Sequence, residues 1–199
     1  DGASHQSLSY VAMTSSVPHV DVYELTCSDE AFVLVSEVIE KFAQDRAHGK
    51  TPNTSLFFLG RENFQKRFLP EAMNYHTGKA QTLFDNSSQF QKSVLLVVAG
   101  SLVPQGLEAS KILAESGVGA IVINPSIINR PDIATFRSAL VQTDGRLLTV
   151  EDHHVIGGMG AQLIHSLVLE GIFLKAQSLA IRDFGRSAYQ ADELYADHG

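Results

Sequence analysis

A run typical of a β-strand passes directly into a run typical of an α-helix in LTVEDHHVIGGMGAQL, which spans Leu148–Leu163. The strand is expected over Arg146–Asp152, and the helix from about Gly160 to Glu170. The helix has a spacing that predicts one buried apolar face, formed by Leu163, Ile164, Leu167 and Val168. Strands and helices alternate on both sides of this stretch, which predicts an α/β fold with a parallel sheet and helices on both faces.

The alternation divides into two groups. The first is expected to hold a strand, a helix and a buried strand, namely Val20–Thr26, Asp29–Asp45 and Ser55–Leu59. The second begins with a strand apolar enough to be buried on both faces and continues in the same order. Its expected elements are Ser93–Gly100, Pro104–Ser116 (with Ala109, Ile112 and Leu113 inward), Gly119–Asn124, Asp132–Gln142, Arg146–Asp152, Gly160–Glu170, Lys175–Ile181 and Ala188–Tyr195.

The first group looks incomplete, because two strands and one helix are too few for a sheet that buries itself. Thr26 and Ser28 offer capping hydroxyls to its helix. An apolar stripe along this helix is formed by Phe32, Val35, Ile39 and Phe42. Residues 60–92 lack strong periodicity and are expected to cross irregularly between the groups. We therefore predict a first domain over 1–75, a linker over 76–92 and a second domain over 93–199.

Two chemical interpretations of the opening stretch are unfavourable. On a strand, Glu151 and His153 point to one face and Asp152 and His154 to the other, so each face offers two ligands where zinc needs three or four. We therefore expect no metal site here. The spacing G-G-x-G departs from the dinucleotide fingerprint G-x-G-x-x-G, so the glycines are expected to serve a tight turn and close packing.

Composition excludes several classes of protein. With 199 residues and 44% hydrophobic residues the chain can bury one large or two small cores. A net charge of −7 without a long basic cluster argues against nucleic acid as a partner. No apolar run reaches the ~18 residues of a membrane span, and the polar start lacks a signal peptide's basic region. Cys27 is the only cysteine, so a reducing, cytoplasmic compartment is expected and a nucleophilic role is not.

Taken together, several segments resemble the C-terminal domain of transketolases and their thiamine-diphosphate relatives. They are VVAGSLVPQGLEASKILAESGVGAIVINPSIINRPD, DGRLLTVEDHH with the following GGMG, and IRDFGRSAYQADELY. The resemblance covers Ser93 to the end. In that family this domain contributes to assembly and carries no catalytic residue, which implies that the opening stretch is architectural.

The other end of the chain resembles the pyrimidine-binding domain of the same family. DGASHQ (Asp1–Gln6) is similar to the motif D-G-x-[TS]-H-Q, and SLFFLGREN resembles a strand that ends in a functional arginine, although Gly60 stands where Ser or Thr is usual. The resemblance implies a partial thiamine-diphosphate pyrimidine-binding domain followed by a mostly parallel, Rossmann-like transketolase C-terminal domain.

Site roles follow from the resemblance residue by residue. His5 would handle protons beside the cofactor-bound substrate, work that suits an imidazole near pH 7. Asp1 would accept hydrogen bonds from sugar hydroxyls, and Arg61 would bind the sugar phosphate through its planar fork of donors. The reaction implied is transfer of a two-carbon ketol unit between sugar phosphates, as in the pentose phosphate pathway.

The resemblance also implies that this chain is inactive alone. The family's cofactor-activating glutamate and its G-D-G…N segment for Mg²⁺ have no counterpart in these residues. Thiamine diphosphate and Mg²⁺ are therefore expected in the complete enzyme and not on this chain. We expect an N-terminal transketolase portion or subunit as partner, a homodimer, and a start at Asp1 that reflects a split gene, proteolysis or a fragment.

Three alternatives remain open at this point. A deoxyxylulose-phosphate synthase or a 2-oxoacid dehydrogenase β subunit would share the C-terminal domain, although the Asp-Gly before Ser-His-Gln favours transketolase. A non-catalytic assembly or regulatory module would have lost its catalytic portion. A nicotinamide-dependent dehydrogenase would need to bind its cofactor at GGMG.

Overall fold

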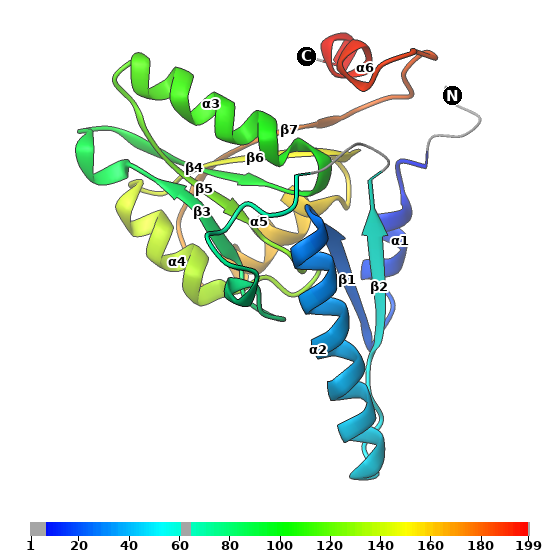
Figure 1. The fold of residues 1–199 in the computed structure, drawn as a ribbon. Helices are drawn as coiled ribbons and strands as arrows, with labels where there is room; N and C mark the ends of the chain where they lie inside the picture. The colour runs from blue at the N-terminus through cyan, green and yellow to red at the C-terminus, as the bar shows by residue number, and fades with distance from the viewer. Residues whose placement is uncertain (1–6, 61–64, 199) are drawn as a thin grey trace.

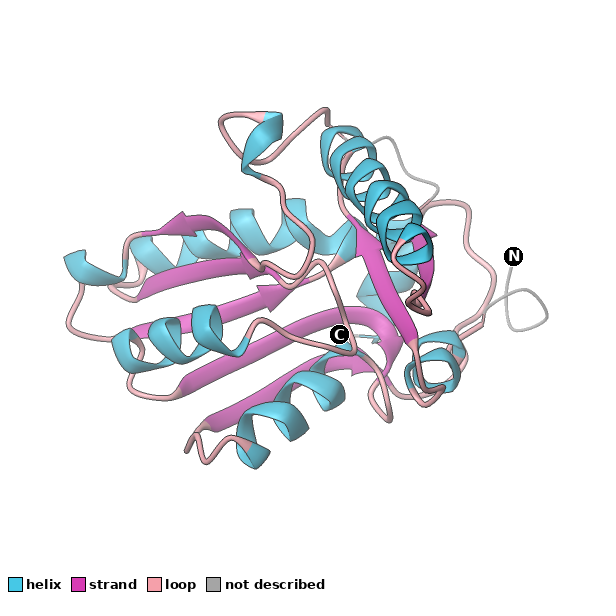
Figure 2. Cartoon of the chain, turned by 90° about the horizontal axis from the view of Figure 1, so that it is seen from below, coloured by secondary structure: helices cyan, strands magenta, loops and turns pink. Residues whose placement is uncertain are grey.

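The computed structural model describes residues 7–60 and 65–198 and contains two sheets (Figure 1). One has two strands in the order β1-β2, and the other has five in the order β3-β5-β4-β6-β7. The two strands run crosswise beyond one end of the larger sheet (Figure 2). None of the described helices is long and apolar enough to cross a membrane.

The N-terminal unit has the predicted order of strand, helix and strand. Its elements are α1 (Tyr10–Ser15), β1 (Val20–Leu25), α2 (Ser28–Ala47) and β2 (Thr54–Leu59), with β1 and β2 parallel. The short α1 was not predicted. β2 is half-buried, so its prediction as a buried strand was wrong.

The start of α2 differs from the predicted capping. Cys27 occupies the cap position without a side-chain hydrogen bond. The Glu30 carboxylate instead reaches back and accepts hydrogen bonds from the N–H and the hydroxyl of Thr26, both at 2.7 Å. The first turn is thus stabilised by an acid inside the helix, which also suits the positive end of the helix dipole.

The apolar stripe of α2 is largely exposed. Phe32 is 75% and Ile39 62% exposed, Phe42 is also exposed, and the buried positions are Glu30 and Leu34. Figure 1 shows the far end of α2 extending away from the five-stranded sheet. Two strands cover one side of this helix only, so most of its apolar stripe has no cover within the described chain.

The C-terminal unit confirms the mostly parallel sheet. β5, β4, β6 and β7 are parallel neighbours, and β3 pairs antiparallel with β5 at the edge. Before this unit lies η1 (Ala72–Asn74), which contacts α2, and the elements of the unit are β3 (Gln81–Asp85), η2 (Ser87–Gln89), β4 (Ser93–Val98), η3 (Gly100–Leu102), α3 (Val103–Glu115), β5 (Gly119–Asn124), α4 (Ile133–Gln142), β6 (Arg146–His154), α5 (Met159–Leu169), β7 (Lys175–Ile181) and α6 (Ala191–His198).

β3 corrects the prediction of an irregular crossing over residues 60–92. It is short, partly buried and interrupted by a register shift between Thr82 and Phe84. An edge strand of this kind has no regular alternation of apolar and polar residues, so its sequence carries little signal. The predicted boundaries between first domain, linker and second domain stay a prediction.

Helices cover both faces of the larger sheet, with α3 and α6 on one face and α4 and α5 on the other (Figure 1). Separate apolar clusters fill the two interfaces. Two residues predicted to face inward, Ile112 and Val168, are each 57% exposed. The apolar faces of α3 and α5 are therefore wider than the part of each helix that packs against the sheet.

The two units meet where β1 packs against the segment that follows β5. The Glu24 N–H donates to the Ser126 carbonyl (3.1 Å), and the Asn129 side chain binds β1 through the Val22 N–H and the Val20 carbonyl. This contact brings β1 against the carboxyl ends of the strands in the larger sheet. Ligands of open parallel sheets bind at that edge.

Candidate functional site

The residues predicted to carry the chemistry, Asp1, His5 and Arg61, lie outside the described residues. Their convergence on one sugar-phosphate pocket therefore stays a prediction. The described chain offers a different polar site, at the carboxyl ends of β1, β4 and β6.

The glycine-rich turn before α5 is occupied by the protein's own carboxylate. Glu151, near the end of β6, accepts hydrogen bonds from the backbone N–H groups of Met159 (2.5 Å) and Gly160 (2.9 Å). These are free donors at a helix N-terminus, where an anion is favoured. Burial raises the Glu151 pKa to about 7, although the two hydrogen bonds act in the opposite direction.

The glycines make room for this carboxylate. A Cβ on Gly158 would lie 2.3 Å from Glu151 Oε2, and one on Gly160 would lie 2.3 Å from Thr149 Oγ1. The prediction that these glycines serve a tight turn and close packing is confirmed. A dinucleotide phosphate would have to displace Glu151, which counts against the dehydrogenase alternative.

A second polar group, the His153 cluster, joins the two units. We define it as Tyr10 from α1, Glu24 from β1, Ser101 after β4, and Asp152 and His153 from β6. The side chains of His153 and Glu24 are 1% and 8% exposed, so both are withdrawn from solvent.

The contacts in the His153 cluster are specific. His153 Nδ1 lies 3.3 Å from Asp152 Oδ1 and 3.7 Å from Glu24 Oε2, and its Nε2 hydrogen-bonds with the Tyr10 hydroxyl. The Ser101 hydroxyl donates to Asp152 Oδ2 at 3.0 Å. Gly100 provides space for Glu24, because a Cβ there would lie 2.2 Å from Glu24 Oε1.

Burial controls the protonation of this cluster. It raises the pKa of Glu24 well above its ordinary value, and the nearby acids Asp152, Glu151 and Glu30 raise it further. Burial lowers the pKa of His153, so the imidazole is held neutral although Asp152 opposes the shift. A neutral imidazole beside two carboxyl groups can share a proton or bind a cation.

Three of these residues have the composition of a metal site. Glu24, Asp152 and His153 each place one potential ligand atom within 4.8 Å of the others. The expectation of two ligands per face failed to foresee this, because Glu24 comes from another strand and Asp152 and His153 converge at the end of β6. The β6–β7 register shifts at that point, between Val150 and His154. The available signal for Glu24 was an acid next to the last residue of β1, a strand that is apolar apart from this residue, Tyr23 and Asp21.

A further buried group is held together by its own hydrogen bonds. The Asn124 side chain at the end of β5 donates to Glu30 Oε1 and to Gln81 Oε1, both at 2.9 Å. Burial raises the Glu30 pKa, while its hydrogen bonds lower it. These contacts connect α2, β3 and β5, so the group is structural.

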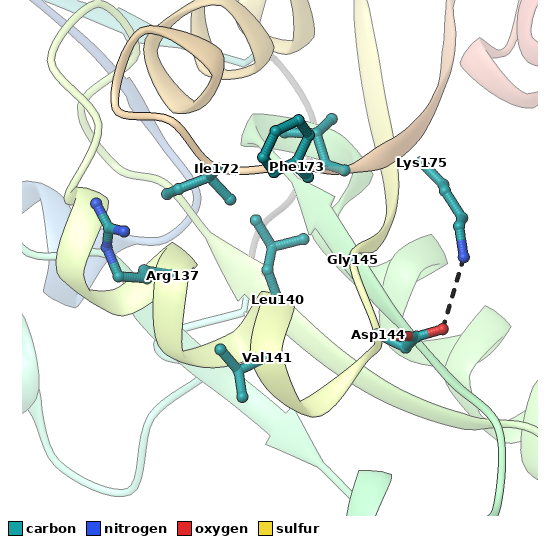
Figure 3. A pocket seen from close by; sticks show the side chains of 9 residues that line it. Arg137, Leu140, Val141, Asp144, Gly145, Ile172, Phe173 and Lys175 are labelled. Atoms are coloured by element: carbon teal, nitrogen blue, oxygen red, sulfur yellow. Dashed lines mark ion pairs between the residues drawn. The ribbon is translucent and has the colours of Figure 1, made fainter.

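Two hollows lie at opposite ends of strands β6 and β7 in the larger sheet. One, of about 300 Å³, opens near the ends of β6 and β7 beside α6, and Glu151 and Asp152 contribute to its wall. The other, of about 520 Å³, lies at the starts of β6 and β7 (Figure 3). Its rim carries Phe173, which is 96% exposed, and the Lys175–Asp144 ion pair at 3.6 Å. The second hollow lies at the amino ends of these strands, whereas open parallel sheets bind ligands at the carboxyl ends.

Comparisons with known proteins agree with the resemblance found in the sequence. Residues 86–199 match the family model described as "Transketolase, C-terminal domain". A "Putative transketolase C-terminal section" from Methanocaldococcus jannaschii is 26% identical over 200 residues, covering 100% of this chain and 57% of that protein. One subunit of an apulose-4-phosphate transketolase from Phocaeicola vulgatus is 26% identical over 83% of this chain and 48% of its own length. Human "Transketolase-like protein 2" is 27% identical over 94% of this chain and 30% of its own length.

Solved structures share the fold. A "Split gene transketolase, inactive beta4 tetramer" aligns with a TM-score of 0.72 at 23% identity, over 90% of this chain and 54% of that one. A transketolase mutant from Pichia stipitis aligns over 100% of this chain and 26% of its own, with a TM-score of 0.67 at 21% identity. The chain thus spans little more than half the length of these relatives, or less. Its matched region exceeds half of its own residues, and the chain belongs to the transketolase C-terminal domain family.

Proposed function

We propose that the chain is the C-terminal portion or a subunit of a thiamine-diphosphate-dependent transketolase, which transfers a two-carbon ketol unit between sugar phosphates. The observation that carries this proposal is the alignment of the whole chain with a relative named as a transketolase C-terminal section. A relative named as one subunit of a transketolase supports a division of the enzyme into separate chains.

Within the assembly, we propose that Asp1, His5 and Arg61 contact the substrate. His5 exchanges protons with the substrate oxygens, because imidazole both donates and accepts near neutral pH. Asp1 accepts hydrogen bonds from the sugar hydroxyls. Arg61 binds the phosphate, since its guanidinium presents paired donors to the phosphate oxygens.

The cofactor is proposed to lie on the N-terminal portion. Thiamine diphosphate supplies a carbanion that attacks carbonyl carbon when it is bound. The glycine-rich turn of this chain does not fit a diphosphate, because the Glu151 carboxylate occupies its N–H groups. The N-terminal portion would also cover the exposed face of α2 and extend the two-stranded sheet.

A donor panel on the assembled enzyme tests the proposal. Three donors are offered in parallel: a ketose phosphate with an aldose phosphate acceptor, pyruvate with glyceraldehyde phosphate, and a 2-oxoacid with a lipoyl acceptor. We expect consumption of the ketose phosphate and a product two carbons longer than the acceptor. Preferential use of pyruvate or the 2-oxoacid would assign the chain to one of the related enzymes, and activity on none would favour a non-catalytic module.

A further inference from the structure

Two polar atoms of the His153 cluster are buried without a hydrogen-bond partner among the described residues. They are His153 Nδ1 and Glu24 Oε2. Both belong to side chains more than nine-tenths buried, at 1% and 8% exposure. An unsatisfied buried polar atom destabilises the folded protein, so a ligand that satisfies both atoms at once is favoured.

We propose that this cluster binds a divalent transition-metal ion, Zn²⁺ fitting best, through His153 Nδ1, Asp152 Oδ1 and Glu24 Oε2. The site is independent of the proposed transketolase activity. It would link β1 of the N-terminal unit to β6 of the larger sheet by metal–ligand bonds.

The distances suit a small tetrahedral ion. Bonds of about 2.0–2.1 Å to Zn²⁺ hold tetrahedral ligand atoms about 3.4 Å apart. His153 Nδ1 lies 3.3 Å from Asp152 and 3.7 Å from Glu24, which brackets that separation. The remaining separation, between the two carboxylate oxygens, is at most 4.8 Å, and a bound ion would draw these oxygens together.

The contacts around the ligands favour metal binding. The Tyr10 hydroxyl occupies His153 Nε2, which leaves Nδ1 free to bind a metal when Nε2 carries the proton. The Ser101 hydroxyl donates a hydrogen bond to Asp152 Oδ2, and Asp152 Oδ1 faces His153 Nδ1. Hydrogen bonds to the outer atoms of metal ligands commonly fix their orientation in this way.

Charge points to the same class of ion. Metal binding requires both acids to be deprotonated, and one neutral imidazole with two carboxylates then sums to −2, which a divalent cation neutralises inside a buried site. A nitrogen ligand with two carboxylate oxygens suits Zn²⁺, Mn²⁺ or Fe²⁺ better than Mg²⁺, which prefers an all-oxygen octahedron and retains its water.

Metal analysis of the complete protein, purified without an affinity tag or chelator, tests the proposal. After incubation with Zn²⁺ and dialysis, we expect about one equivalent per chain to be retained. Glu24→Gln and His153→Gln should each lose it, and the matched control His165→Gln, at an exposed histidine of α5, should retain it. Tyr10→Phe keeps all three ligands and should weaken Zn²⁺ affinity by about 10–100-fold.

Co²⁺ substitution of the unaltered protein makes the test independent of whether the variants fold. Tetrahedral Co²⁺ gives strong visible absorption, which we expect to appear and to be displaced by Zn²⁺ and not by Mg²⁺. The proposal is overturned if the unaltered protein retains no Zn²⁺, or if Glu24→Gln and His153→Gln, with native circular dichroism, retain as much as His165→Gln.

Discussion

Glu151 shows how a single residue converts a turn that resembles a ligand site into a structural one. Its carboxylate accepts the N–H groups that begin α5, and two glycines without side chains let it approach. Burial keeps its folded pKa near 7, far above the ordinary value of 4.5. The folded protein therefore retains the Glu151 proton over a pH range in which the unfolded chain has released it.

This shift predicts a pH dependence of stability. Between pH 4.5 and 7 the folded state binds more protons than the unfolded state, so the free energy of unfolding falls as pH rises. The contribution of Glu151 to stability is fully present below pH 4.5 and is lost above pH 7. The free energy of unfolding changes by about 3 kcal/mol across this range. Urea unfolding at pH 4.5 and 8 should show this loss in the unaltered protein and a smaller one in Glu151→Gln.

The matched control for this measurement is Glu115→Gln, at an exposed acid of α3. It should lose as much stability between the two pH values as the unaltered protein. An equal loss in Glu151→Gln would contradict the assignment of the proton to the cap of α5.

Arg61 carries the most specific prediction about the substrate. Charge-assisted hydrogen bonds contribute about 1.5–3 kcal/mol. Arg61→Ala should therefore lower kcat/KM for phosphorylated acceptors by about 10–150-fold. Unphosphorylated sugars should be affected little, because they lack the phosphate. Steady-state kinetics of the assembled enzyme with both kinds of acceptor measures this difference, with Arg46→Ala, at the exposed end of α2, as control. An equal loss of kcat/KM for both acceptors would show that Arg61 does not bind the phosphate.

Among the elements, α2 is the one whose apolar stripe contacts little of the described chain. Phe32 and Ile39 lie on one exposed face, next to a sheet with only two strands. Exposed apolar faces of this kind mark interaction sites. Under the proposed function, the occupant is the N-terminal transketolase portion.

Polar substitutions on this face should therefore weaken assembly without affecting folding. Phe32→Ser and Ile39→Ser are each expected to reduce affinity for the N-terminal portion by about tenfold, from 1–2 kcal/mol of lost contact. Thermal unfolding of the chain should change little, because neither side chain is buried in it. Titration calorimetry provides the measurement, and Gln44→Ser, on another side of α2, is the control. Unchanged affinity in both variants would place the partner elsewhere.

Helices and strands were best predicted from the sequence where their buried apolar residues recur at regular spacing. The helices and parallel strands of the larger sheet were predicted because their apolar residues recur at a helical or strand period. β3 and α1 were not, since an interrupted edge strand and a helix of six residues carry too little pattern. Exposure of Phe32, Ile112 and Val168 could not be predicted either, because periodicity gives a face and not what covers it.

For the whole molecule, the decisive contact is between β1 and the carboxyl ends of the larger sheet. It creates the His153 cluster from residues as far apart in sequence as Tyr10 and His153. Residue spacing along β6 could not indicate this grouping, because Glu24 is contributed by the other unit. Groups assembled across units in this way require the tertiary structure, whereas the turn before α5 is local and the close packing of its glycines was predicted.

The proposed function requires this chain to complete a transketolase whose cofactor is bound by an N-terminal portion. The most direct measurement mixes the two portions with thiamine diphosphate, Mg²⁺, an aldose phosphate and a ketose phosphate labelled at its first two carbons, and follows the label by mass spectrometry. We expect labelled product from the mixture and none from either portion alone. Label transfer by this chain alone, or none from a complex that has bound the cofactor, would contradict it.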